Sequence, residues 1–199
     1  MLAEMSRTNN IYKALEVTKK MFGVTADIFP ATDERVRLSA ITKDGRRIHG
    51  ETALDVAKYA EPYGLRKIYI TPKDPIVNES VLNSLKEADV IISGPGDLYT
   101  NQLPVMIVPQ IKKQLLAANC RKIFILNIAN KPHETAGYTL KTFINAIKEH
   151  LGVFPFDTII VNNNQSVQIP KKYHQYSYIP VDDELRGANS GFNIVEEDL

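Results

Sequence analysis

Two loops rich in glycine and polar residues contain the side chains whose types and spacing could do chemistry. The first loop covers residues 93–101 (Ser-Gly-Pro-Gly-Asp-Leu-Tyr-Thr-Asn) and follows the apolar segment 89–92. The second covers residues 127–138 (Asn-Ile-Ala-Asn-Lys-Pro-His-Glu-Thr-Ala-Gly-Tyr) and follows the apolar segment 122–126. Ligands of parallel α/β sheets bind beyond the carboxyl ends of the strands. The sequence therefore predicts that both loops open on the same edge of one sheet.

The first loop has the composition of an anion site. Gly94 and Gly96 allow the backbone to approach a ligand closely and to adopt a positive φ. Backbone N–H groups at the start of the next helix favour an anion such as phosphate, and Thr100 and Asn101 add short side-chain donors. Gly-Pro-Gly is also an ordinary turn, and Asp97 can be a helix N-cap. The tripeptide alone therefore favours a plain turn over a site.

The second loop offers groups for a sugar or a base. Asn127 and Asn130 can read hydrogen-bonding edges of a base or sugar. Glu134 and Thr135 can bind hydroxyls, and Tyr138 can stack or donate a hydrogen bond. His133 and Glu134 are more often solvated loop residues than ligands. What favours a site is the convergence of two polar loops. The residues by themselves predict a small-ligand site in an α/β protein.

Composition excludes several classes of function. The chain has 199 residues, with 24 basic and 23 acidic side chains for a net charge of +1. It therefore has no basic excess for nucleic acid and no basic cluster for an anionic membrane surface. Its apolar runs are too short to span a bilayer, so we expect a cytosolic protein without membrane insertion. The single Cys120 excludes an intrachain disulfide and a cysteine-based zinc site.

The pattern of the chain predicts an α/β fold with a mostly parallel sheet and a β-hairpin excursion. Gly23 is suited to end the first helix, Pro30 to end the first strand, and Asp44-Gly45 to turn the hairpin. Asn78 can cap a later helix. The expected helices are 10–21, 78–88, two short pieces beginning near Pro104 and Pro109, and 138–151. The expected strands are 24–29, 35–40, 46–49, 67–71, a buried strand at 89–92, 122–127 and 158–162.

Residues 1–165 are expected to form a single α/β domain, with the hairpin excursion at about 35–50. Residues 166–199 are expected to form a polar, tyrosine-rich C-terminal extension, with the last ten residues loosely held.

The two loops carry a family resemblance. Residues 94–100, followed by Leu103-Pro104, resemble the Gly-Pro-Gly-Ser-Leu-Tyr-Thr-Ser…Pro signature of the 2-phospho-lactate transferase / gluconeogenesis-factor family. Residues 127–138 resemble its Asn…Gln-Pro-Gly-Glu-Thr-x-Gly-Tyr segment. The match covers most of residues 1–165. The Leu-Tyr-Thr sequence at residues 98–100 is closer to the gluconeogenesis-factor (YvcK-like) branch than to the phospholactate transferase (CofD-like) branch.

The resemblance implies a three-layer Rossmann-like sandwich. The gluconeogenesis-factor branch further implies binding of UDP-N-acetylglucosamine and a link to central carbon metabolism and cell-wall growth. The ligand-binding residues that it implies are Gly94, Pro95, Gly96, Asp97, Leu98, Tyr99, Thr100, Asn127, Glu134, Thr135, Gly137, Tyr138 and Tyr173.

Three departures from the family pattern matter. Nothing corresponds to its first strand, its Gly-Gly-Gly-Thr-Gly phosphate loop and its Asp-Asp-Gly-Gly-Ser-Ser segment. Asp97 replaces a serine, and its carboxylate would repel a phosphate. A basic motif expected near the C-terminus has no counterpart. About half of the pocket is therefore expected here, in a fold without its first βα units. We expect the exposed sheet edge to be filled by dimerisation, which would make the protein a homo-oligomer, by a second chain or by an altered strand order.

The leading functional hypothesis is a regulator that binds a nucleotide sugar or nucleotide phosphate without turnover. The first alternative is a structural or interaction module that binds no such ligand. The second is a phosphoryl-group transferase, in which Asp97 and Glu134 would be candidate Mg²⁺ ligands. A metal hydrolase using Asp97, His133 and Glu134 is the weakest alternative, because one histidine and two carboxylates are a weak signal. No cofactor is expected apart from Mg²⁺ in the transferase case.

Overall fold

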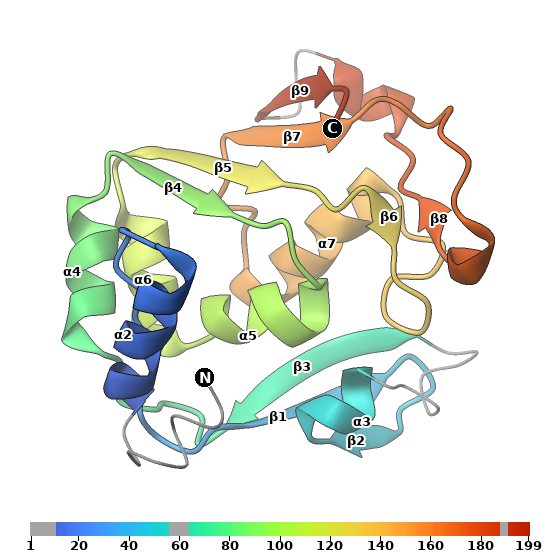
Figure 1. The fold of residues 1–199 in the computed structure, drawn as a ribbon. Coiled ribbons are helices and arrows are strands. Elements are labelled where there is room, and N and C mark those ends of the chain that lie inside the picture. The colour runs from blue at the N-terminus through green and yellow to red at the C-terminus, as the bar shows by residue number, and fades with distance from the viewer. Residues whose placement is uncertain (1–10, 56–63, 188–190) are drawn as a thin grey trace.

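The fold is organised around a four-stranded parallel sheet (Figure 1). The computed structural model describes residues 11–55, 64–187 and 191–199. The strand order is β4-β5-β7-β9, and every neighbouring pair is parallel. The four strands are β4 (Val90–Ser93), β5 (Arg121–Ile125), β7 (Thr158–Asn162) and β9 (Asn193–Glu197). The α/β class with a mostly parallel sheet, predicted from the strand–helix alternation, is confirmed.

A second sheet is antiparallel and contains the predicted hairpin. Its order is β2-β1-β3, and Gly45 takes the left-handed conformation in the turn, with φ +90°. Residues 67–71 were expected to join the parallel series, but β3 pairs antiparallel with β1 instead. The strand was recognised correctly and its partner was not, because a short apolar run does not encode which strand it pairs with. The strands are β1 (Arg37–Thr42), β2 (Arg47–His49) and β3 (Leu65–Thr71).

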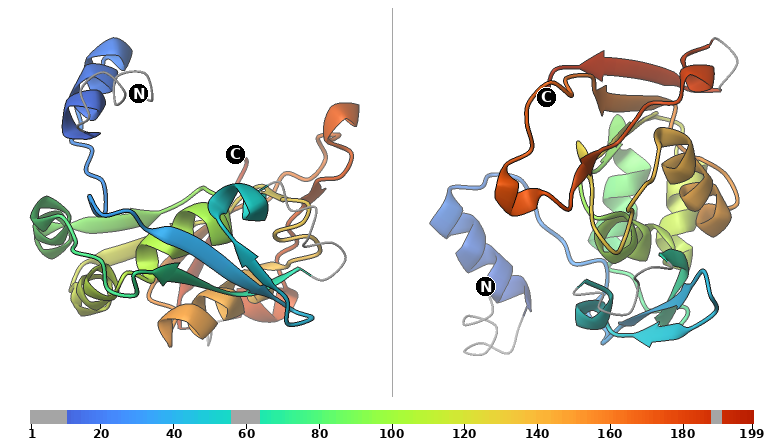
Figure 2. Two further views of the ribbon diagram at one scale, coloured as in Figure 1. Left: turned by 90° about the horizontal axis from the view of Figure 1, so that it is seen from below. Right: turned by 90° about the vertical axis from the view of Figure 1, so that its right-hand side faces the viewer.

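Helices pack on one side of the parallel sheet (Figure 2). The best predicted of them is α7 (Leu140–Leu151), which Thr139 caps through its side-chain oxygen and which Gly152 ends at φ +86°. As expected, Asn78 caps α4, by accepting a hydrogen bond from the Ser80 N–H. The other helices on this side are α4 (Glu79–Glu87), α5 (Leu103–Met106) and α6 (Pro109–Ala117). Pro109 begins α6, as predicted.

The opposite face of the parallel sheet carries no helix among the described residues (Figures 1 and 2). The segment 89–92 was predicted to be a buried strand; the strand is present, but the predicted burial holds on one face only. Only Ile91 of β4 is buried, whereas Val90 is 46% and Ile92 59% exposed. The pattern is that of a strand covered on one face.

Two further expectations fail at the ends of the chain. Residues 24–29 form no strand. They are exposed and connect α2 (Ile11–Phe22) to the rest of the chain, without a neighbouring strand among the described residues to pair with. The last ten residues were expected to be loosely held, yet β9 pairs with β7 along its whole length. The backbone hydrogen bonds to β7 hold this strand in place, and a short polar sequence does not predict such pairing.

The remaining elements are short. No described helix is long and apolar enough to cross a membrane. The short elements are α3 (Glu51–Asp55), β6 (Ala129–Asn130), β8 (Ser177–Tyr178), a π-helical turn η1 (Leu98–Gln102), and the 3₁₀ turns η2 (Lys171–Tyr173) and η3 (Asp183–Arg186). Antiparallel pairing of β6 with β8 ties the C-terminal segment to the second loop.

Candidate functional site

The first loop is fixed by a glycine that no other residue can replace without strain. Gly94 follows β4 with φ +90°, and a Cβ at this position would lie 2.4 Å from the Ile125 carbonyl oxygen of the neighbouring strand. The Gln102 side chain closes the turn by donating to the Gly96 carbonyl at 2.6 Å and accepting from the Ser93 hydroxyl at 3.0 Å. The Gly-Pro-Gly sequence therefore holds a tight turn directly against β5.

The two predicted loops meet at the carboxyl ends of β4 and β5. The Gly96 N–H donates to Asn127 Oδ1 at 2.9 Å, and the Tyr99 N–H donates to Glu134 Oε1 at 2.6 Å. The prediction that both loops open on one edge of the sheet is confirmed by these contacts. They also show that the loops use part of their hydrogen-bonding capacity on each other.

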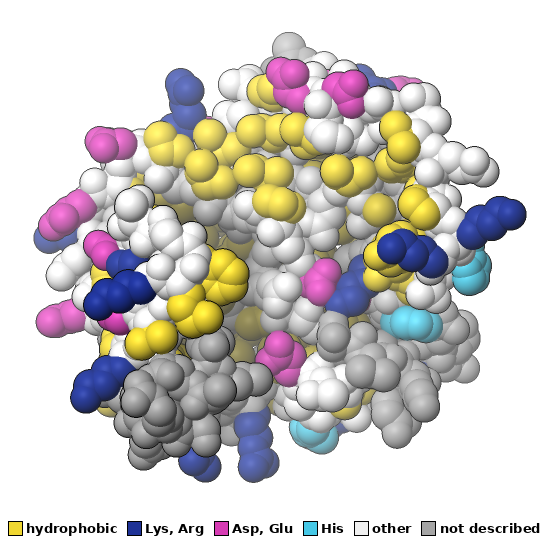
Figure 3. All heavy atoms as spheres, in the orientation of Figure 1, with side chains coloured by type: hydrophobic (Ala, Val, Ile, Leu, Met, Phe, Trp, Pro, Cys, Tyr) yellow, Lys and Arg dark blue, Asp and Glu magenta, His cyan; other side chains and the backbone are white. Residues whose placement is uncertain are grey.

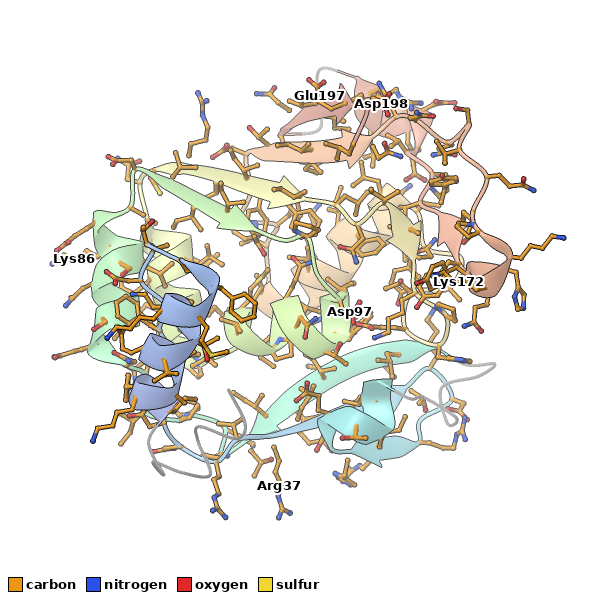
Figure 4. The ribbon with its side chains drawn as sticks, in the orientation of Figure 1. Arg37, Lys86, Asp97, Lys172, Glu197 and Asp198 are labelled. Carbon is orange, nitrogen blue, oxygen red and sulfur yellow. The ribbon has the colours of Figure 1, made fainter. Side chains whose placement is uncertain are left out.

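An ion pair joins the loops at their surface. Lys131 Nζ lies 2.6 Å from Asp97 Oδ2 and 3.6 Å from Glu134 Oε2. Figure 4 places Asp97 at the start of the helical turn that faces the second loop. The repulsion that Asp97 was expected to exert on a phosphate is therefore offset by a lysine ammonium. Lys131 is not among the site residues predicted from the sequence. A signal was present, because the signature that the loops resemble has Gln at the position of Lys131 and Ser at that of Asp97.

Glu134 is a buried carboxylate that holds the first loop. Its side chain is 2% exposed, and burial raises its pKa above the usual range. The hydrogen bond from the Tyr99 N–H opposes that rise, while Asp97 adds to it and Lys131 opposes it. The N–H at the start of the helical turn, which we expected to be exposed for an anion, is thus already satisfied by a carboxylate of the protein. In this arrangement Glu134 positions the backbone.

A pair of buried tyrosines connects the site to the core. Tyr99 and Tyr138 have their hydroxyl oxygens 2.9 Å apart, and the Tyr138 hydroxyl also donates to the Leu65 carbonyl at 3.4 Å. Burial raises the pKa of both phenols, so both stay neutral at physiological pH. Leu98 and Thr135 are buried as well, and the Thr135 hydroxyl accepts from the Lys131 N–H at 3.0 Å.

The predicted site residues therefore divide by accessibility. Those at least partly open to solvent are Gly94, Pro95, Gly96, Asp97, Asn127 and Gly137. Those that are buried are Leu98, Tyr99, Thr100, Glu134, Thr135 and Tyr138. A ligand can reach the residues of the first set directly. The buried residues of the second set hold the backbone of the loops in place. Thr100 Oγ1 is a buried oxygen without a hydrogen-bond partner among the described residues.

Tyr173 does not join this cluster. It is exposed on η2, where Lys172 lies 4.7 Å from its ring centroid and Tyr176 packs edge-on against it. Figure 1 places η2 beyond β8, on the side away from η1. Its alignment with a ligand-contacting tyrosine stays a prediction.

The residues do not fit a divalent cation. No group of three or more His, Cys, Asp or Glu side chains within residues 11–55, 64–187 and 191–199 is placed to hold a metal ion. The two candidate carboxylates, Asp97 and Glu134, have an ammonium group between them. A second cation at that point would be repelled, since like charges at this distance disfavour each other.

A cavity of about 350 Å³ lies beside the first loop, at the outer edge of β4. Polar groups of Ser93, Asn101 and Gln102 form one rim, and apolar side chains from β4, α4, α5 and α6 form most of its wall. No residue of the second loop lines it. The cavity therefore adjoins the junction of the two loops and shares Gly96 with it.

Comparison with known proteins places the chain in a family. The model of the 2-phospho-L-lactate transferase CofD family matches residues 1–199. The gluconeogenesis factor of Bacillus subtilis (strain 168) is 31% identical over 203 residues, covering 100% of this chain and 62% of the relative. The gluconeogenesis factor of Halalkalibacterium halodurans is 30% identical over 201 residues, covering 97% of this chain and 61% of the relative.

A crystal structure of a UPF0052-family protein from Bacillus halodurans shares the fold, with a TM-score of 0.83 and 28% identity. The match covers 98% of this chain and 62% of that one. The chain thus spans about three fifths of the length of these relatives. From the full-length family match and the shared architecture, we conclude that the chain belongs to the 2-phospho-L-lactate transferase CofD family.

Proposed function

We propose that this chain is a cytosolic regulator of the gluconeogenesis-factor type, which binds a UDP-N-acetylglucosamine-like nucleotide sugar or nucleotide phosphate without turnover. Its targets would be central carbon metabolism and cell-wall growth. The name of the Bacillus subtilis relative supports the branch of the family. The observation that carries the proposal is the joining of the two loops by the Gly96–Asn127 and Tyr99–Glu134 hydrogen bonds and the Lys131–Asp97 ion pair.

The ligand would lie over the solvent-facing side of this junction. Gly96 brings backbone close to the surface, and the Asn127 amide and the Lys131 ammonium are partly exposed beside it. An amide suits the hydroxyls and carbonyls of a sugar or base, and an ammonium suits a phosphate. The buried Glu134 and Tyr138 keep these groups in place.

Binding without turnover follows from how the carboxylates are used. Asp97 is paired with Lys131, and Glu134 accepts the Tyr99 N–H inside the protein. Neither carboxylate is left to activate a nucleophile, and the ammonium between them disfavours the Mg²⁺ ion that phosphoryl transfer needs.

Thermal unfolding with UDP-N-acetylglucosamine, UDP and N-acetylglucosamine tests the proposal. We expect UDP-N-acetylglucosamine to raise the Tm, because a ligand at a hundred times its Kd stabilises by about 2.7 kcal/mol. Lys131→Gln should reduce that shift, and Lys141→Gln should not, since Lys141 forms a solvent-exposed pair with Glu184 elsewhere. An unchanged Tm with every compound at millimolar concentration would contradict ligand binding.

One observation favours a second candidate, a structural module that binds no nucleotide. The Gly96 and Tyr99 N–H groups both donate hydrogen bonds to side chains of the second loop, so neither is left for a ligand. Native mass spectrometry with a panel of nucleotides and nucleotide sugars separates the two candidates, because the module would retain none of them.

A further inference from the structure

We propose that the outer edge of β2 binds a small phosphorylated molecule, such as a sugar phosphate, at a place separate from the junction of the two loops. A cavity of about 240 Å³ lies at this edge. The residues that line it are Arg46, Arg47, Ile48, His49 and Ala53. The site goes beyond the function proposed above and does not depend on it.

The lining of this cavity is rich in hydrogen-bond donors. Arg46 and Arg47 supply guanidinium groups, which match the geometry of phosphate oxygens, and His49 supplies an imidazole. No acidic side chain of the described part of the chain lines the cavity. Its volume lies below the range of about 300–1,000 Å³ that is typical of larger ligand pockets. The cavity therefore suits a phosphate group that carries a small organic part.

The two arginines have different roles. Arg46 Nε lies 2.7 Å from Asp44 Oδ2, and this ion pair holds the Arg46 guanidinium beside the turn of the hairpin. The Arg47 side chain is exposed and forms no ion pair within residues 11–55, 64–187 and 191–199. Arg47 is therefore the cation that a bound anion would neutralise.

The backbone of β2 adds donors at the same edge. β2 is the outermost described strand of its sheet. The Arg46 carbonyl and the Gly50 N–H are both bonded to β1. Because successive residues of an antiparallel strand direct their backbone groups to alternate sides, the groups of Arg47 and His49 point away from β1. Their N–H groups suit phosphate oxygens, and their carbonyls can accept from the hydroxyls of an attached sugar.

A buried serine orients the His49 ring. The Ser39 hydroxyl lies 3.0 Å from His49 Nδ1, and Ser39 is 4% exposed. When this hydroxyl donates, the imidazole carries its hydrogen on Nε2. The ring can then donate to an oxyanion from Nε2 while Nδ1 stays bound to the protein. Ser39 and His49 are cross-strand partners, so the register of the hairpin brings the pair together.

The register also places further cations on the sheet face that carries Arg47. Arg47 and Lys67 are both cross-strand partners of Ile41, and Arg37 precedes Ile41 by four residues on the same face. In Figure 4, Arg37 points away from the body of the molecule. Figure 3 shows Lys and Arg side chains projecting at the lower border, where the antiparallel sheet lies in Figure 1. The positive potential of this face would raise the local concentration of an anion.

Isothermal titration of the 199-residue chain with inorganic phosphate and with glucose 6-phosphate tests the proposal. We expect both to bind and glucose, the uncharged control, not to bind. Arg47→Gln should weaken the binding at least tenfold, because it removes the guanidinium at the cavity. Arg37→Gln is the matched control, since Arg37 is exposed on the same face but does not line the cavity, and it should change the Kd less than twofold. Circular dichroism of both variants checks that they fold.

Amide chemical shifts supply a second measurement. Glucose 6-phosphate should shift the N–H resonances of Arg47 and His49. Lys131→Gln, at the junction of the two loops, should leave the affinity for glucose 6-phosphate unchanged, which separates this site from the nucleotide-sugar site. No binding of either phosphate compound at millimolar concentration would overturn the proposal, and so would equal binding of glucose. Equal weakening by Arg37→Gln and Arg47→Gln would overturn it too, because the attraction would then belong to the whole positive face.

Discussion

Lys131 Nζ lies 2.6 Å from Asp97 Oδ2, across 34 positions of sequence, and this contact joins the two loops of the candidate site. Both side chains are mostly shielded from solvent, at 20% and 29% exposure. Each stands where the family segment has an uncharged residue, Gln for Lys131 and Ser for Asp97. The two charges therefore compensate each other, and neither is expected to be tolerated well alone.

A double-mutant cycle tests this coupling. Lys131→Gln leaves Asp97 without its cation next to Glu134, and Asp97→Ser leaves the lysine partly unpaired. We expect each single variant to lose stability and the double variant to lose less than the sum, with a coupling of about 1 kcal/mol. Urea denaturation measures it. Additive losses would mean that the pair contributes nothing beyond its two separate residues.

Glu134 should act through its hydrogen bond to the Tyr99 N–H. Glu134→Ala leaves that buried donor unsatisfied, so we expect a loss of about 2 kcal/mol. Glu134→Gln keeps an acceptor oxygen and should lose clearly less. Equal losses in the two variants, measured by urea denaturation, would show that the acceptor at this position is not what stabilises the loop.

Three glycines of the two loops should respond very differently to alanine. Gly94→Ala combines a positive φ with a Cβ 2.4 Å from the Ile125 oxygen, so a loss of about 3 kcal/mol or more is expected. Gly137 has φ +73° but open space around it, which predicts about 1 kcal/mol. Gly96 has neither problem and should change stability by about 0.5 kcal/mol or less. Thermal unfolding ranks the three, and a Gly94→Ala variant as stable as Gly96→Ala would contradict the geometry.

His150 should make stability depend on pH. Its Nδ1–H donates to the Ala146 carbonyl at 2.7 Å, and its Nε2 accepts from the Ile68 N–H at 3.0 Å, so the folded state holds a neutral ring. Burial lowers its pKa below the ordinary value of 6.5. Between the folded pKa and 6.5, the unfolded chain therefore binds a proton at this ring and the folded chain does not. The contribution is fully present above pH 6.5 and is lost as pH falls toward the folded pKa.

The corresponding measurement is the Tm at pH 7.5 and at pH 5. The decrease toward pH 5 should be smaller in His150→Gln than in the unchanged protein. His174→Gln is the matched control, because that side chain is exposed on the surface and should retain the full decrease. The same decrease in all three proteins would exclude His150 as the source.

Local sequence determined the elements whose signals lie within a few residues of one another. Asn78 caps α4, Gly152 ends α7, and Gly45 turns the hairpin, each as its residue type predicts. The two loops at the ends of β4 and β5 were recognised for the same reason, because glycine and short polar residues directly follow apolar strands. Because the carboxyl ends of parallel strands lie on one edge of the sheet, the sequence also predicted that the two loops lie close together.

Only the tertiary structure decided how those loops are used. Glu134 looks like an exposed loop residue in the sequence, but folding buries it against the Tyr99 N–H, 35 positions away. The pairing of β3 with β1 and the return of β9 to β7 are equally remote along the chain. Burial, ion pairing and strand partners depend on which surfaces meet after folding. A short window of sequence carries the chemistry of each residue but not the neighbour that will satisfy it.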